Sequence, residues 1–400
     1  MIWIASIDTI IFDCEFNEKL DIELISAYEK LIFSDCKLND KIKNLLFKYY
    51  ADDNFDKIYD LSYKKHGSIF NRDVSNLPSN ITHLIFGSYF NQNVSNLPLF
   101  LTHLTFGDNF NKDISNLPLL LTNLTFGYWF NQDASNLPPN LTHLTFGEEF
   151  NQDVSNLPPN LTRLTFGGEF NQDVSNLPPN LTHLTFGGEF NQDVSNLPPK
   201  LTNLTFGNDF NKQVSKLPNT LIHLNFGFSF NQNVSELPPK LTHLSFGDCF
   251  NLDISMLPPK LTHLVFGYDF NQDISKLPKN LTYLSWNCEI EQDLSKLPPS
   301  LTHLRLNSEF KQNYNIPSNI KHLEFNCNNQ YIIDTLPNSI VELELDYYFN
   351  SKIDNLPTSI KKIIIHKHSD YNQDLNCLPN SVEELQLNSL YDKRILNIPS

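Results

Sequence analysis

The chain has 400 residues, a formal net charge of −16 and a charged fraction of 18%, below the quarter that is usual for soluble domains. Its 29 Lys and Arg are spread along the sequence, which argues against the clustered cationic surface that nucleic-acid binding requires. The surplus of carboxylates favours a basic protein or peptide as partner.

The first 60 residues contain no glycine and no proline, unlike the rest of the chain. Met1–Phe12 is apolar, but it lacks the cationic start of a signal peptide and contains an aspartate. Apolar residues at helical spacing predict one helix over residues 24–32 and a second over residues 39–50. We therefore expect residues 1–60 to form a helical N-terminal cap. We expect no membrane segment, because no run approaches about 18 apolar residues.

A proline recurs with a period of 20 residues from Pro78 to Pro298. Five more follow at Pro317, Pro337, Pro357, Pro379 and Pro399, where the pattern is looser. A fixed period of this length is typical of a solenoid in which every repeat forms one coil. The prolines predict about 17 coils in a repeat domain over residues 61–400, with residues 61–80 as a degenerate first coil.

Coil positions are counted from the leucine that opens the Leu-x-x-Leu-x-Phe segment, which is Leu181 in the coil of residues 181–200. This segment predicts a strand of a parallel sheet, with positions 4 and 6 pointing inward and positions 3 and 5 pointing outward. Gly at position 7 predicts a turn, and the prolines predict an extended return with short 3₁₀ turns instead of helices. We expect Phe86, Phe106 and Phe126, all at position 6, to form one internal column.

Position 11 is an asparagine in most coils. We expect its side chain to be buried and to bond backbone groups where the chain leaves the sheet. Stacking of the coils would join these side chains into a ladder. Examples are Asn151, Asn171, Asn191 and Asn211.

Nine of the 12 histidines occupy position 3, on the outward side of the predicted sheet. Strand spacing of about 4.8 Å would place the rings in a row, where like charges should lower their pKa values. A flat row offers no tetrahedral set of ligands, so we expect no metal and no cofactor. The plainest interpretation is a solvated polar row copied by duplication. If it binds a partner, the candidate residues are His143, Arg163, His183, Asn203, His223, His243 and His263.

Positions 8 and 9 follow the strand and combine carboxylates with aromatic residues. Such a rim suits a basic protein surface or peptide. The alternative is a solvated edge whose acids keep the protein soluble. The candidate rim residues are Tyr128, Trp129, Glu148, Glu149, Glu169, Glu189 and Tyr268.

Phe-Asn-Gln-Asp, Leu-Pro and Leu-Thr-His-Leu-Thr-Phe-Gly recur in step over about residues 67–400. This combination resembles the FNIP-repeat family of social amoebae and of large DNA viruses of amoebae, named for a Phe-Asn-Ile-Pro tetrapeptide. The resemblance implies a leucine-rich-repeat-like fold. Two features depart from the family: the period is 20 where 22 is usual, and Asp or Asn replaces the proline of the tetrapeptide, as in Phe150–Asp153.

Some members of the family carry an F-box before the repeats, which makes them substrate receptors of ubiquitin ligases. This chain has no proline before Pro78, so the Leu-Pro opening of an F-box is missing. A divergent F-box that binds a ubiquitin-ligase adaptor stays an alternative to a plain cap.

We therefore predict a β-rich α/β solenoid, a right-handed leucine-rich-repeat-like coil with a concave parallel β-sheet and a helical N-terminal cap. Its expected function is that of a protein–protein interaction scaffold or adaptor, without enzymatic activity, which binds partners on the concave sheet and the acidic rim. The alternatives are a substrate receptor of a ubiquitin ligase and a structural or assembly protein.

Three of the cysteines, Cys249, Cys288 and Cys327, lie two coils apart from each other, beyond the reach of a disulfide. Unpaired thiols are typical of a reducing compartment. We expect a cytoplasmic protein, located in the host cytoplasm if it is viral.

Overall fold

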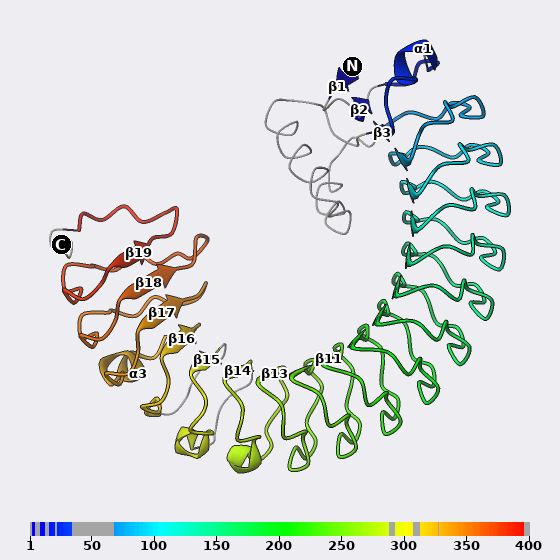
Figure 1. Ribbon diagram of the computed structural model, residues 1–400. Coiled ribbons are helices and arrows are strands. Elements are labelled where there is room, and N and C mark those ends of the chain that lie inside the picture. The colour runs from blue at the N-terminus through cyan, green and yellow to red at the C-terminus, as the bar shows by residue number, and fades with distance from the viewer. Residues whose placement is uncertain are drawn as a thin grey trace. The chain divides into compact units, whose positions relative to one another are not determined.

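The computed structural model describes residues 2–4, 9–12, 16–20, 22–33, 68–287, 293–306, 313–326 and 328–395. It divides into two compact units, Met1–Gly207 and Asn208–Ser400. In each unit the described chain is a parallel β-solenoid that adds one strand per coil, and the strands line the inner side of the curve of that unit (Figure 1).

Unit 1 begins with a strand that runs against the others. β1 pairs with β2 in antiparallel register, and β2 to β10 pair as parallel neighbours in chain order. Like positions of successive coils face each other, as Leu144 faces Leu164. The elements are β1 (Ile2–Ile4), β2 (Thr9–Phe12), α1 (Ile22–Ile25), β3 (Lys30–Phe33), β4 (His83–Ile85), β5 (His103–Thr105), β6 (Asn123–Thr125), β7 (His143–Thr145), β8 (Arg163–Thr165), β9 (His183–Thr185) and β10 (Asn203–Thr205).

Unit 2 repeats this arrangement with parallel strands in chain order. Its strands are β11 (His223–Asn225), β12 (His243–Ser245), β13 (His263–Phe266), β14 (Tyr283–Trp286), β15 (His303–Leu306), β16 (His322–Phe325), β17 (Glu342–Leu345), β18 (Lys362–Ile365) and β19 (Glu384–Gln386). Two outer turns form 3₁₀ helices, η2 (Ile274–Lys276) and η3 (Leu294–Lys296), and a third forms the short helix α3 (Gln330–Asp334). The prediction of an outer wall of extended chain or short 3₁₀ turns is therefore confirmed for η2 and η3, the outer turns of most other described coils are extended chain with simple turns, and α3 was not predicted.

The strands β4 to β19 number sixteen, and each follows one of the prolines from Pro78 to Pro379. Pro399, the last proline counted in the prediction, lies outside the described residues. The described chain thus holds about sixteen of the expected coils.

Phenylalanines at positions 6 and 10 form two columns in the core. The ring centroids of Phe86 and Phe106 are 5.7 Å apart, and those of Phe106 and Phe126 are 5.6 Å apart. In the second column Phe90 and Phe110 are 6.2 Å apart. These near-parallel rings confirm the predicted column and add favourable aromatic contacts to the burial of apolar surface.

The expected helix over residues 24–32 is wrong beyond Ile25. Helix α1 ends at Ile25, whereas Leu31 and Ile32 belong to β3 and are almost fully buried. A short apolar run that is buried on both faces cannot be distinguished from a helix by its spacing. The other expected helix, over residues 39–50, lies outside the described residues.

The strand β3 occupies the place of a repeat strand. Its Phe33 lies 5.8 Å from Phe86 of the next coil, at the spacing of the position 6 column. Phe70 packs on Phe33 at 4.0 Å and on Phe90 at 6.2 Å, as a position 10 residue does. Residues 68–80 therefore supply the return of the coil whose strand is β3.

Asparagines at position 11 form the predicted ladder between coils. The Oδ1 of Asn151 accepts the N–H of Asn171 at 3.0 Å, and the Oδ1 of Asn171 accepts the N–H of Asn191 at 3.0 Å. Their expected burial is wrong: these three side chains are only half-buried, and Asn211 is exposed. The ladder therefore satisfies backbone groups at the surface of the stack rather than in its core.

Replacement of one ladder residue should destabilise the coil that follows it. In Asn171→Ala the N–H of Asn191 loses its acceptor at 3.0 Å. The Nε2 of Gln192 loses one acceptor at 2.9 Å and keeps the backbone carbonyl of residue 171 at 3.0 Å. We expect the local opening free energy at Asn191 to fall by about 1–2 kcal/mol, read from amide hydrogen exchange. Asn171→Asp keeps the acceptor oxygen and should lose less. Equal losses in the two variants would contradict this role.

Candidate functional site

The outward side of the sheet presents positions 3 and 5 of every coil, and we call it the strand face. At position 3, His143, His183 and Asn203 are half-exposed and Arg163 is exposed, while Leu144 at position 4 is 1% exposed. The predicted alternation is therefore confirmed. Strand pairing brings the unit 1 candidates into one row, His143 beside Arg163, Arg163 beside His183 and His183 beside Asn203. The unit 2 candidates form another row, His223, His243 and His263.

The threonine at position 2 lies between a carbonyl of the preceding coil and the next histidine. The hydroxyl of Thr242 lies 3.3 Å from the Ile222 carbonyl, and that of Thr262 lies 3.2 Å from the Thr242 carbonyl. The same hydroxyls lie 2.8 Å from Nδ1 of His243 and 2.9 Å from Nδ1 of His263. The threonines therefore hold both imidazole rings in place through Nδ1.

The histidine rings of unit 2 stack on each other. The ring of His243 lies 4.2 Å from those of His223 and His263. Burial, and then the like charges of His263 and His223, lowers the pKa of His243. Burial is also the main cause that lowers the pKa values of His263 and His303. The expected direction is confirmed, but burial contributes more than the neighbouring charges that suggested it.

Unit 2 should lose stability as the pH falls below the ordinary histidine pKa of about 6.5. Because its pKa is lowered, His243 binds fewer protons in the folded state than in the unfolded state. Its contribution to the free energy of unfolding is therefore fully present above the ordinary histidine pKa and is lost as the pH falls to the lowered folded pKa. We expect faster amide exchange in β11–β13 at about pH 5.5 than at about pH 7.5, after correction for the intrinsic rate. His243→Gln cannot titrate and should lose less. An equal loss of stability in His243→Gln would contradict the role of His243 in this pH dependence.

The row of imidazoles does not converge on a common point. The rings of His303 and His322 lie 4.1 Å apart and are parallel within 1°, so they stack face to face. Among the described residues, no group of three His, Cys, Asp or Glu side chains is arranged to hold a metal ion. The row is thus a surface of stacked imidazole rings.

Positions 8 and 9, the rim, carry a second backbone ladder. The N–H of Trp129 donates to the Asp108 carbonyl at 2.8 Å, and the N–H of Glu149 donates to the Tyr128 carbonyl at 3.0 Å. Glu169 and Glu189 continue this ladder in the next coils of unit 1. The rim side chains therefore project from a backbone that is already held in place, which lowers the entropy cost of binding.

Tyr268 is the rim candidate that belongs to unit 2. Its side chain is 61% exposed, and its N–H donates to the Oδ1 of Asp248 at 3.2 Å. It is therefore an exposed aromatic residue beside a carboxylate that already bonds the rim backbone.

Glu148 has a structural role that the sequence did not reveal. Its Oε2 accepts the N–H of Gly168 at 3.0 Å, and a Cβ at residue 168 would overlap the same carboxylate. Gly168 thus leaves room for Glu148 to fold over the rim. The second glycine of the Gly167-Gly168 pair is the signal in the sequence that could have indicated this contact.

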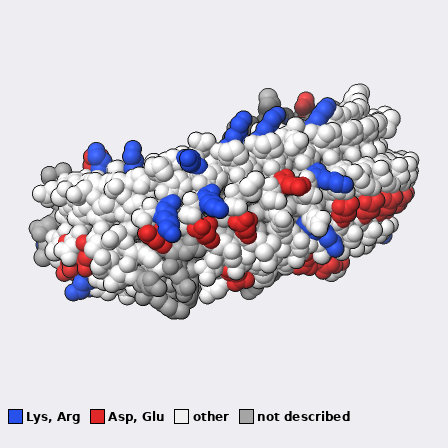
Figure 2. Space-filling model, turned by 90° about the horizontal axis from the view of Figure 1, so that it is seen from below, with Lys and Arg blue, Asp and Glu red and all other residues white. Residues whose placement is uncertain are grey.

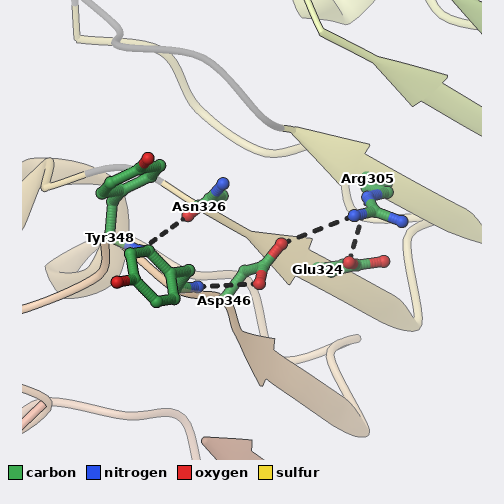
Figure 3. A network of polar contacts seen from close by, with 6 residues as sticks. Arg305, Glu324, Asn326, Asp346 and Tyr348 are labelled. Atoms are coloured by element: carbon green, nitrogen blue, oxygen red, sulfur yellow. Dashed lines mark hydrogen bonds and ion pairs between the residues drawn. The ribbon is translucent and has the colours of Figure 1, made fainter. Parts of the chain in front are cut away.

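A charged network on the strand face of unit 2 was also missed. Arg305 of β15 forms ion pairs with Glu324 at 3.0 Å and with Asp346 at 3.4 Å (Figure 3). Burial raises the pKa of Glu324 to about 7 against the opposing effect of Arg305, and Glu344 and Asp346 add to the rise. Position 5 is uncharged in every coil before Arg305. That departure from the repeat is the signal that could have found the network.

Protonation of Glu324 favours the folded state, whereas protonation of the histidines with lowered pKa values disfavours it. Its folded pKa of about 7 lies above the ordinary glutamate value of 4.5. The contribution of this group to stability is therefore present at low pH and is lost as the pH rises towards the folded value. The histidines with lowered pKa values and Glu324 therefore respond in opposite ways to acid on the strand face of unit 2.

Charged side chains are sparse elsewhere. Figure 2 shows carboxylates and cations standing on a surface formed mostly by other residues. Some carboxylates are used locally: the Oδ1 atoms of Asp153 and Asp173 accept the N–H of the serine two residues later, each at 3.0 Å. These aspartates stabilise the outer turns, as N-caps do in helices.

Coils of one parallel strand, an outer turn and an extended return, stacked with an asparagine ladder, define a leucine-rich-repeat-like β-solenoid. The profile described as FNIP Repeat matches thirteen overlapping segments from residue 94 to residue 390. The chain belongs to the FNIP repeat family. No curated protein matches the chain.

Among solved structures, the chain is similar to CroV588, a giant-virus protein whose crystal structure is described as a novel circular LRR protein structure. The two are 34% identical with a TM-score of 0.68, and the match covers 99% of this chain. The chain spans 65% of the length of CroV588. A functional domain of InlJ from Listeria monocytogenes is 22% identical, with 68% of this chain and 65% of that one covered and a TM-score of 0.46.

YopM from Yersinia enterocolitica also matches, at 21% identity and a TM-score of 0.35, over 78% of this chain and 88% of that one. Within the described residues, none of the helices combines the length and the apolar character that spanning a membrane requires.

Proposed function

We propose that the chain is a scaffold or adaptor that recognises a protein or peptide partner on its strand face and rim. The observation that carries this proposal is that position 3 changes from His143 to Arg163 and Asn203 while the strand register stays the same. Side chains that vary on an unchanging backbone are suited to recognition by many contacts. Repeat scaffolds of this leucine-rich-repeat-like class typically bind proteins.

A basic partner fits the charge of this surface best. The rim of unit 1 carries Glu149, Glu169 and Glu189 on a fixed ladder, and the whole chain has a net charge of −16. Such a surface attracts cationic segments and repels the phosphates of nucleic acids. The proposed function is therefore binding and not catalysis. None of the described residues favours a ubiquitin-ligase box or an assembly role over it.

The proposal is tested by comparing two faces of the same coils. A photo-reactive phenylalanine derivative is placed at residue 163 or residue 203 on the strand face, or at Asn176 or Asn196 on the exposed outer turn. In extract of the cells that contain the protein, we expect an adduct of one defined mass from the strand-face variants only. Adducts that are equal on both faces, or confined to the outer turn, would contradict recognition by the strand face.

A further inference from the structure

Two aromatic side chains stand exposed side by side on the rim of unit 1. Tyr128 is 43% exposed and Trp129 is 51% exposed, and their ring centroids lie 4.8 Å apart at an angle of 62°. Their backbone is held on both sides by the rim ladder, through Asp108 and Glu149. The pair therefore offers a pre-positioned edge-to-face aromatic corner made of two residue types that are enriched in protein interfaces.

The aromatic corner lies in a long stretch of the chain that has almost no cations. Residues 113–199 contain nine carboxylates and a single cation, Arg163. Burial, and then the charges of Glu149, Glu148 and Glu169, raise the pKa of the Tyr128 phenol. Three carboxylates are thus near enough to act on the aromatic corner.

The three carboxylates near the aromatic corner differ in whether they are already hydrogen-bonded. Glu148 is occupied by the N–H of Gly168. Within the described part of the chain, neither Glu149 nor Glu169 makes a side-chain hydrogen bond or ion pair. Glu149 and Glu169 are therefore available to a ligand that approaches the rings.

We infer that Tyr128 and Trp129, with Glu149 and Glu169, form the docking point for an arginine side chain of a basic partner protein. This inference rests on the proposed function and names the chemistry of one anchor in it. A guanidinium group is planar, stacks on aromatic faces and pairs with carboxylates through several donors at once. Lysine can supply the charge but not the planar contact, and a neutral apolar segment would leave the carboxylates desolvated without a partner.

The test uses the full chain and short flexible peptides with two arginines between Gly and Ser residues. Matched peptides carry lysine, or citrulline, which keeps the shape of arginine without its charge. Tryptophan fluorescence reports binding to the wild type, and the difference between wild type and Trp129→Leu separates the signal of Trp129 from those of Trp3 and Trp286. We expect the arginine peptide to bind more tightly than the lysine peptide, and the citrulline peptide to give no change.

The variants separate the anchor from general attraction by charge. Measured by calorimetric titration, which does not need Trp129 as a probe, Trp129→Leu and Glu149→Gln should each weaken binding of the arginine peptide by about five- to tenfold. Glu236→Gln removes the same charge from an exposed outer turn and should leave affinity unchanged. Equal binding of the citrulline peptide, or an equal effect of Glu236→Gln, would overturn the anchor. If strand-face cross-linking finds a protein partner whose affinity Trp129→Leu does not change, the anchor fails while the proposed function stands.

Discussion

Phe170→Ala is expected to lower the local stability of unit 1 by about 3–5 kcal/mol. The Phe170 side chain is 0% exposed, and its ring lies 6.2 Å from Phe150, 6.1 Å from Phe190 and 3.7 Å from Phe166. Removing it leaves a cavity that borders three rings in three successive coils. Because repeats depend on their neighbours for burial, the loss should extend to the adjacent coils and fade beyond them.

Amide hydrogen exchange resolved along the chain measures this effect, since a repeat array does not unfold in one two-state step. Phe170→Leu keeps most of the apolar volume and should lose less. Phe228→Ala removes an aromatic ring that is 52% exposed on the rim of unit 2 and should change little. A loss in Phe170→Ala that was spread evenly over the whole chain, or that Phe228→Ala matched, would contradict the account of the core column.

The repeat fold could be predicted because the fixed period gives equivalent residues of successive coils the same packing environment. A residue at position 6, such as Phe106, has the same neighbours in every coil, so one correct assignment applies to all of them. The alternation between buried position 4 and half-exposed position 3 follows from strand geometry alone. For this reason the strand-face candidates, among them His143 and His243, lie where the sequence placed them.

The strand β3 was not predicted because its distance from the next repeat strand does not match the fixed period. Leu31-Ile32-Phe33 has the same sequence as Leu84-Ile85-Phe86, the first strand that the period identifies. The two segments are 53 residues apart, so a count by twenties passes over the match. Comparing tripeptides without regard to spacing would have shown that β3 is a repeat strand and not part of a helix.

Contacts between unlike residues of neighbouring coils could not be predicted from the period. The pairing of Glu148 with Gly168 depends on a carboxylate that folds back, and the pKa of Glu324 depends on burial beside Arg305. Both arise at positions where one coil departs from the others. The positions of the rim and the strand face could therefore be predicted from the sequence. It could not be predicted which of their side chains remain available to a partner.

Gly187→Ala is expected to destabilise unit 1 by about 2–3 kcal/mol, because an added Cβ would meet backbone atoms that cannot move aside. It would overlap the carbonyl group of Gly167 in the preceding coil. Gly187 does not adopt the left-handed backbone conformation, so the requirement for glycine comes from the close approach of the coils. The turn that the sequence analysis assigned to position 7 is therefore not the main reason for glycine there.

The adjacent Gly188 provides a matched control. A Cβ at Gly188 would have the carbonyl oxygen of Gly168 at 3.8 Å as its nearest neighbour, an ordinary van der Waals contact. Gly188→Ala should therefore be neutral or stabilise by up to about 1 kcal/mol, since alanine reduces the entropy of the unfolded chain. Hydrogen exchange in β8 and β9 should rise in Gly187→Ala only. If the two variants behaved alike, close stacking of the coils would not be what selects glycine at position 7.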